Sequence, residues 1–199
     1  MNAMSAGSNA RTWQIVSDRL LEPRAPTPLI APDKGDPIAW YRQIGDGLIK
    51  ALRSTPPGTN VFCVTNQQTV GAWARRQASE TSVHRWDAQN AFVMAEPIEH
   101  ADDFIVEIFD HLLPGLIANF GAPSPTGTIG LASTDEKLAW RASPMPGGVG
   151  LERGHSIADV TLSGTTSDLF LALWNRPAAI DIVGDQDVLR QWRRAIAGN

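Results

Sequence analysis

The sequence predicts an α+β fold, in which a bundle of four helices is followed by a small α/β domain. Up to residue 122, apolar side chains recur every three or four positions, as they do on the buried face of a helix. After the Ala-Pro-Ser-Pro-Thr-Gly segment at residues 122–127, the spacing shortens to about two residues, which is typical of strands. We therefore predict two domains, residues 1–122 and residues 128–199.

The N-terminal domain contains segments with helical spacing that are separated by prolines. The predicted helices are residues 10–21, 37–52, 69–95 and 101–117. Pro23 ends the first helix early, and five prolines between residues 23 and 37 predict a loop. A short β-branched stretch at residues 60–65 leads into the third helix. Pro114 is expected to kink the fourth helix or to end it early.

The C-terminal domain contains alternating apolar and polar residues between short turns. Residues 128–131 and 137–142 are predicted to form a hairpin, with the turn at 133–135. The elements expected after it are a strand at 158–163, a helix at 165–175, a strand at 179–183 and a helix at 187–196.

Composition excludes several functional classes. With 199 residues and 43% hydrophobic composition, the chain can bury one sizeable core or two small ones. The formal net charge of −4 disfavours binding to nucleic acid or to an anionic membrane. Cys63 is the only cysteine, so an intrachain disulfide is impossible, and a buried, inert thiol is expected. Without a secretory signal or an apolar run of about 20 residues, the protein is expected to be soluble and cytoplasmic.

One helix carries residues that suit a metal ion. Glu80 and His84 are four residues apart, so on a helix their side chains reach a common point. A carboxylate oxygen and an imidazole nitrogen are ligands for zinc or a similar divalent ion, but a catalytic zinc site needs three protein ligands. The alternative is an exposed ladder of alternating charge formed by Arg76, Glu80 and His84. The remaining histidines have no partner at ligand spacing and are expected at the surface or at helix caps: His100, His111 and His155.

The segment 69–88 resembles the signature helix of the mycothiol-dependent maleylpyruvate isomerase family. An arginine pair in this segment precedes the pattern E-x-x-x-H-R-W-D-A. Further segments that resemble the family are residues 39–42, 97–104, 158–164, 168–176 and 183–185. The resemblance implies a DinB-like metal-binding bundle, a C-terminal domain similar to the sterol-carrier-protein fold, and use of mycothiol, the thiol cofactor of certain high-GC bacteria.

The resemblance also implies a particular chemistry. In the isomerase, two histidines and a glutamate hold a divalent metal, and Glu80 and His84 match two of these three ligands. The thiol adds to an unsaturated acid, permits rotation and then leaves. Zinc would favour the thiolate, which is the nucleophile that this chemistry needs.

The chain departs from the family at its N-terminus. The family's other histidine lies on the first helix, at a position that corresponds to about residues 6–8 here, and no histidine precedes His84. The first helix is therefore truncated, or the true start of the protein lies upstream, or this member has lost its metal. A shortened first helix would leave an apolar groove exposed, and a homodimer that covers this groove is expected.

These observations lead to a functional hypothesis with a rival. The first hypothesis is a mycothiol-dependent isomerase or transferase that acts on a small acidic or electrophilic compound, with Glu80 and His84 as metal ligands. Arg176 is assigned to the catalytic site, where its guanidinium would bind a substrate carboxylate at the cleft between the domains. Its alternative role is a cap at a helix C-terminus.

Asp87 is either an orienting partner of His84 or a solvated acid. The rival hypothesis is a non-catalytic binding protein with an incomplete metal site.

Overall fold

A computed structural model describes residues 35–154 and 157–197 of the chain. The predicted first helix at residues 10–21 and His155 lie outside the described residues. The chain divides into two compact units, whose described parts are residues 35–63 with 68–74 and residues 64–67 with 75–154 and 157–197. The segment 122–127, where the sequence predicts a domain boundary, lies within the second unit.

The first unit is built around helix α2 (Pro37–Ser54). The Asp36 carboxylate caps this helix by accepting a hydrogen bond of 2.9 Å from the backbone N–H of Ile38, and Pro37 fits the first turn because its missing N–H has no helical partner there. The small core of this unit contains Ile44, Leu48, Cys63, Ala72 and Trp73. Cys63 is fully buried, as predicted. The β-branched stretch at residues 60–65 forms a single bridge, between Asn60 and Thr69, instead of a strand.

Helix α3 (Val70–Asn90) begins in the first unit and continues into the second. It confirms the predicted third helix, but it ends at Asn90, five residues before the predicted end at 95. The residues after it include Phe92, Val93 and Met94, all of which are exposed. An apolar pattern alone therefore overestimates the length of this helix.

The predicted fourth helix passes through Pro114 and reaches residue 120. It consists of α4 (Ala101–Glu107), a π-helical turn η1 (Ile108–Leu112) and α5 (Leu113–Phe120). Of the two outcomes predicted for Pro114, an early end of the helix is therefore wrong, whereas a kink stays a prediction. The π-helical turn precedes the proline, and π-turns of this kind accommodate irregularities within helices. The backbone carbonyls of Asp110 and His111 accept hydrogen bonds from the Asn66 side chain and backbone, at 2.9 and 3.0 Å, which satisfies acceptors beside the proline.

Gly115 allows the segment around Asn66 to approach this helix closely. A Cβ atom at residue 115 would lie 2.4 Å from the carbonyl oxygen of Val64, 2.5 Å from the Thr65 carbonyl carbon and 2.6 Å from the Asn66 nitrogen. All three atoms belong to the backbone, so a larger side chain cannot be accommodated by a rotamer change.

The described residues of the second unit also form a mixed five-stranded sheet. Its strands are β1 (Ile129–Ser133), β2 (Ala139–Met145), β3 (Gly148–Arg153), β4 (Val160–Gly164) and β5 (Asp181–Gly184). The strand order is β3-β2-β1-β4-β5, in which β1 and β4 are parallel and the other neighbours are antiparallel. The predicted hairpin of β1 and β2 and the predicted strands β4 and β5 are confirmed. Strand β3 is absent from the sequence prediction.

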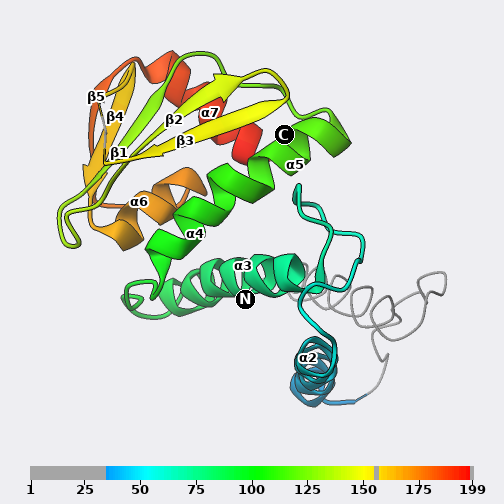
Figure 1. The fold of residues 1–199 in the computed structure, drawn as a ribbon. Coiled ribbons are helices and arrows are strands. Elements are labelled where there is room, and N and C mark those ends of the chain that lie inside the picture. Colours follow the sequence, from blue (N-terminus) through cyan, green and yellow to red (C-terminus); the bar gives the residue numbers. More distant parts are fainter. Residues whose placement is uncertain (1–34, 155–156, 198–199) are drawn as a thin grey trace. The chain divides into compact units, whose positions relative to one another are not determined.

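One face of the sheet is covered by helices. These are α4–α5, α6 (Thr166–Leu173) and α7 (Gln186–Ala197), and their side chains share a core with the sheet (Figure 1). Ring contacts join the helices, with 5.5 Å between the centroids of Phe104 and Phe170 and 5.7 Å between those of Phe109 and Trp192. The α+β class is therefore confirmed. The four-helix bundle and the likeness to the sterol-carrier-protein fold stay predictions.

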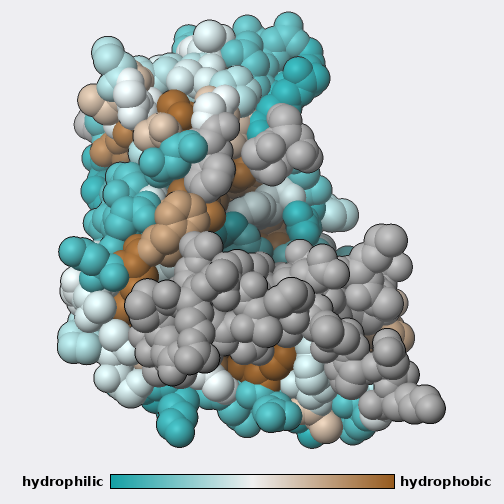
Figure 2. Space-filling view, turned by 90° about the vertical axis from the view of Figure 1, so that its right-hand side faces the viewer, coloured by the Kyte–Doolittle hydropathy of each residue, from teal (hydrophilic) through white to brown (hydrophobic). Residues whose placement is uncertain are grey.

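Hydrophobic residues also occur at the surface. On the face drawn in Figure 2, hydrophobic areas lie between hydrophilic ones. The large hydrophobic residues exposed in the second unit are Phe92, Val93, Met94, Leu138, Met145, Ile157 and Val183. Within the described part of the chain, no helix combines the length and apolar character needed to cross a membrane.

Candidate functional site

Glu80 and His84 lie next to each other on α3. One helical turn separates them, and the Oε2 atom of Glu80 is 3.3 Å from the Nε2 atom of His84. Both side chains are about three-quarters buried, with exposed fractions of 25% and 29%. The carboxylate and the imidazole therefore converge on one point, as their spacing in the sequence predicts.

Asp87 contacts the opposite edge of the imidazole. Its Oδ2 atom lies 3.2 Å from Nδ1 of His84. In the tautomer with its proton on Nδ1, His84 donates a hydrogen bond to this carboxylate. The lone pair of Nε2 is then directed at Glu80. This arrangement is the one expected of a carboxylate that orients a metal-binding histidine. Because Glu80 and Asp87 lie at different nitrogens of the ring, they do not act as two ligands of one ion.

The alternating charges of the predicted ladder are in contact, but they lie on a mostly buried face instead of the exposed one that was expected, with the Arg76 side chain 11% exposed. Arg76 forms an ion pair with Oε1 of Glu80, so each oxygen of Glu80 has its own neighbour. The guanidinium of Arg76 also lies over the ring of Trp174, 5.2 Å from its centroid, which is a cation–π contact. Glu80 is therefore held by a cation on one side and faces His84 on the other. Both interpretations of this segment have contacts that support them.

The donor set of this site is suitable for a divalent ion but supplies two ligands. One nitrogen and one oxygen donor are a combination that zinc accepts. Among residues 35–154 and 157–197, no three His, Cys, Asp or Glu side chains are grouped closely enough to hold a metal ion. The described residues thus fit part of a metal site.

The end of helix α6 determines the position of Arg176. Asn175 has a left-handed conformation with φ of 57°, which asparagine tolerates better than most residues. The N–H of Asn175 donates to the carbonyl of Ala172 at 3.1 Å, and that of Arg176 donates to the carbonyl of Leu171 at 2.9 Å. These bonds form a Schellman motif, and Pro177 prevents the helix from continuing.

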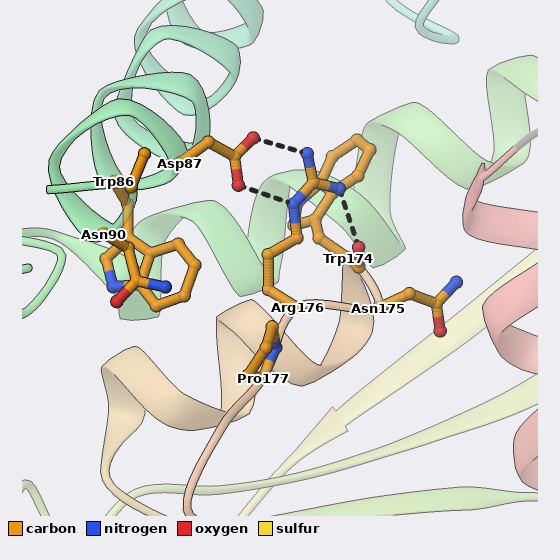
Figure 3. A pocket seen from close by; sticks show the side chains of 8 residues that line it. Trp86, Asp87, Asn90, Trp174, Asn175, Arg176 and Pro177 are labelled. Atoms are coloured by element: carbon orange, nitrogen blue, oxygen red, sulfur yellow. Dashed lines mark hydrogen bonds and ion pairs between the residues drawn. The ribbon is translucent and has the colours of Figure 1, made fainter. Parts of the chain in front are cut away.

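Arg176 forms a two-pronged ion pair with Asp87. Its Nε atom is 3.0 Å from Oδ1 and its Nη2 atom is 2.7 Å from Oδ2, while Nη1 donates to the Trp174 carbonyl at 2.8 Å (Figure 3). Burial works to raise the pKa of Asp87, but the hydrogen bonds and charge of Arg176, together with His84, outweigh burial, and the net pKa is lowered. Asp87 is therefore ionised at neutral pH, and the contact with Trp174 is the helix-capping contact predicted as the alternative for Arg176.

Arg176 and Asp87 line an open cavity of about 640 Å³. Its walls also include the side chains of Trp86, Asn90, Trp174 and Asn175 (Figure 3). Sequence reasoning selected Arg176 but missed Trp174, which both stacks under Arg76 and supplies the carbonyl for Arg176. Its position in the sequence could have identified it, because Trp174 directly follows an apolar helical segment and precedes the Asn-Arg-Pro residues that end the helix.

Together, these features define a class of protein in which one helix carries a glutamate–histidine pair and a mixed five-stranded sheet follows later in the chain. Residues 2–89 match the sequence model of the mycothiol maleylpyruvate isomerase N-terminal domain. This match covers less than half of the chain and confirms, for the N-terminal part, the resemblance found in the sequence. The match includes Glu80, His84 and Asp87 and ends before α4, so the sheet and Arg176 lie outside it. Comparisons with curated proteins and with solved structures found no match.

Proposed function

We propose that this protein binds a divalent metal ion, with zinc as the first candidate, through Glu80 and His84 and acts in mycothiol-dependent chemistry. The reaction would be an isomerisation or a transfer on a small acidic or electrophilic compound. The observation that carries this proposal is the convergence of the Glu80 carboxylate and the His84 imidazole at 3.3 Å. This pair lies in the part of the chain that matches the family.

The surrounding side chains support this proposal. Asp87 contacts the imidazole nitrogen that is remote from Glu80, so it would hold the tautomer whose Nε2 can bind a metal. When bound, the metal would supply positive charge that favours the thiolate form of mycothiol. Arg176 lines the neighbouring cavity, where a guanidinium would attract the carboxylate of an acidic substrate.

A second candidate function is a non-catalytic binding protein that retains the family scaffold. Two observations favour it: the described residues supply two metal ligands, and Arg76 already neutralises Glu80. A catalytic zinc site usually has three protein ligands. In this case the cavity beside Arg176 would bind an acidic compound without converting it.

The metal content of the purified protein separates the two functions. The protein is prepared without chelators, analysed by mass spectrometry for bound metal, and titrated with Zn²⁺. We expect Glu80→Ala and His84→Ala each to weaken Zn²⁺ binding by at least about 100-fold. Loss of a metal ligand should have a larger effect than loss of a residue that only hydrogen-bonds to a ligand, which typically weakens metal binding by about 10- to 100-fold. Asp87→Ala is expected to weaken it by about 10- to 100-fold.

A matched control is His100→Ala, which removes an exposed histidine outside this site. It should leave Zn²⁺ affinity unchanged. Stoichiometric metal in the Glu80→Ala, His84→Ala double variant would contradict the assignment of these ligands. Mycothiol-dependent turnover of an unsaturated acid by the metal-loaded protein would then distinguish an enzyme from a binding protein.

A further inference from the structure

A second cavity, of about 460 Å³, contains none of the residues of the candidate site. It is lined by side chains of α3 and by residues 100–111 in the second unit. The polar residues in its wall are Arg75, His100, Asp103, Glu107 and His111, and the apolar ones are Ala78, Phe104 and Val106. Cavities of this size accommodate small organic ligands.

Glu107 is the unusual member of this wall. Its side chain is 3% exposed, and its Oε2 atom accepts a hydrogen bond of 3.3 Å from Nε of Arg75. The Oε1 atom is buried and has no hydrogen-bond donor among the described residues. Buried carboxylate oxygens are almost always paired, so an unpaired one beside a cavity indicates a place for a donor. Burial raises the pKa of Glu107, with a smaller contribution from the charge of Asp110, and Arg75 and Arg76 oppose this effect only in part.

The wall carries excess negative charge. Asp103 and Glu107 supply two carboxylates, whereas Arg75 supplies one guanidinium. Arg75 also donates to the side chain of Gln67, so part of its hydrogen-bonding capacity is directed to that residue. Burial lowers the pKa of His111, with a further contribution from Arg75, which keeps this histidine neutral at pH 7. The charge therefore favours a cationic ligand over an anionic one.

The apolar part of the wall indicates what kind of cation fits. The described residues contain no three-donor metal group, whereas Phe104 and Val106 offer a hydrocarbon surface. A compound with one ammonium group and a short apolar body would use both features. Its N–H groups would meet the unpaired acceptor, and its body would cover the aromatic and aliphatic side chains.

We propose that this cavity is a binding site for a small primary ammonium compound, whose N–H donates to the carboxylate of Glu107 and whose hydrocarbon part lies against Phe104 and Val106. The site is separate from Glu80 and His84, and the inference does not depend on metal or mycothiol chemistry.

Benzylamine is a suitable probe, because it has one ammonium group and one phenyl ring. Binding is measured by calorimetric titration of the full chain, with benzyl alcohol and benzoate as neutral and anionic probes of the same size. We expect saturable binding of benzylamine and much weaker binding of the two controls. Glu107→Gln, which retains the side-chain shape, should weaken benzylamine binding by at least about 10-fold. Glu152→Gln, a surface change on strand β3, should leave it unchanged.

A second variant keeps the proposal testable if Glu107→Gln does not fold. Ala78 is exposed on α3 and lines the cavity, so Ala78→Leu places a larger side chain in the space while favouring a helix. This variant should abolish benzylamine binding. Equal affinity of the parent protein and either cavity variant, preferential binding of benzoate, or absence of saturable binding at millimolar benzylamine would overturn the proposal.

Discussion

The ion pair between Asp87 and Arg176 should contribute measurably to stability, and a double-mutant cycle tests this. The two side chains share hydrogen bonds of 2.7 and 3.0 Å, and their exposed fractions are 35% and 27%. Hydrogen bonds to charged groups contribute about 1.5–3 kcal/mol when buried. Because both groups retain contact with solvent, screening reduces this value. We expect a coupling energy of about 1–2 kcal/mol between Asp87→Ala and Arg176→Ala.

Each single variant also loses a contact outside the pair. Arg176→Ala removes the donor to the Trp174 carbonyl, and Asp87→Ala removes the partner of His84. We therefore expect each to lower the free energy of unfolding by about 2 kcal/mol, which corresponds to a decrease in Tm of about 4–8 °C in a chain of this size. Arg176→Lys should recover less than half of the loss, because an ammonium group cannot reproduce the two-pronged geometry.

Urea unfolding of the four proteins in the cycle measures the coupling energy directly. The chain contains a matched control, the Arg141–Glu152 pair on neighbouring strands, whose side chains are 37% and 52% exposed. A cycle on this exposed pair should give a coupling of no more than about 0.5 kcal/mol. If the effects of Asp87→Ala and Arg176→Ala were additive within about 0.5 kcal/mol, the proposed energetic link would be refuted.

Two further predictions concern stability. Gly115→Ala should lower the free energy of unfolding by about 3 kcal/mol or more, because the new Cβ would overlap backbone atoms. The control is Gly58→Ala, because no described atom lies within 4 Å of the Cβ position at residue 58. Equal effects of the two substitutions in urea unfolding would contradict this reasoning. Asp135 accepts hydrogen bonds from Ser133 and from Thr166 at the start of α6, and these hold its pKa well below 3.8. The ionised Asp135 therefore contributes to the free energy of unfolding above pH 3.8, and this contribution is lost as the pH falls through the lowered pKa. Asp135→Ala should lower the free energy of unfolding by about 1 kcal/mol at pH 7 and by less at pH values below the lowered pKa. Urea unfolding of both proteins at a series of pH values measures this difference.

Helices were predictable where their pattern depends on near neighbours. The apolar spacing of α2 and the E-x-x-x-H spacing on α3 are local properties, and one helical turn brings Glu80 next to His84 whatever surrounds them. The alternating strands β1, β2 and β4 were predictable for the same reason. Strand β3 was not, because its glycines at 148 and 150 hide the alternation, and its pairing with β2 determines its conformation.

Features that depend on distant segments could not be predicted from local patterns. The helix passes Pro114 because Asn66, more than 40 residues earlier, supplies donors to the carbonyls beside the proline. The partner of Asp87 comes from residue 176, which no spacing rule connects to α3. Glu107 was missed although it carries a signal: a carboxylate stands within the apolar stripe that includes Phe104 and Ile108. A charged residue at a buried helical position predicts a partner or a ligand.

The contacts of Arg176 are compatible with the role in substrate binding predicted from the sequence. A guanidinium has five N–H donors. Three are used, by Nε and Nη2 toward Asp87 and by Nη1 toward the Trp174 carbonyl, so one N–H remains on Nη1 and one on Nη2. These two remaining donors are available to a substrate carboxylate. Asp87 also contacts His84, and its carboxylate orients the imidazole. An anion bound by Arg176 would therefore weaken the attraction between Arg176 and Asp87 and strengthen the hold of Asp87 on His84. Capping, substrate binding and the orientation of His84 would then act through one connected network of charged side chains.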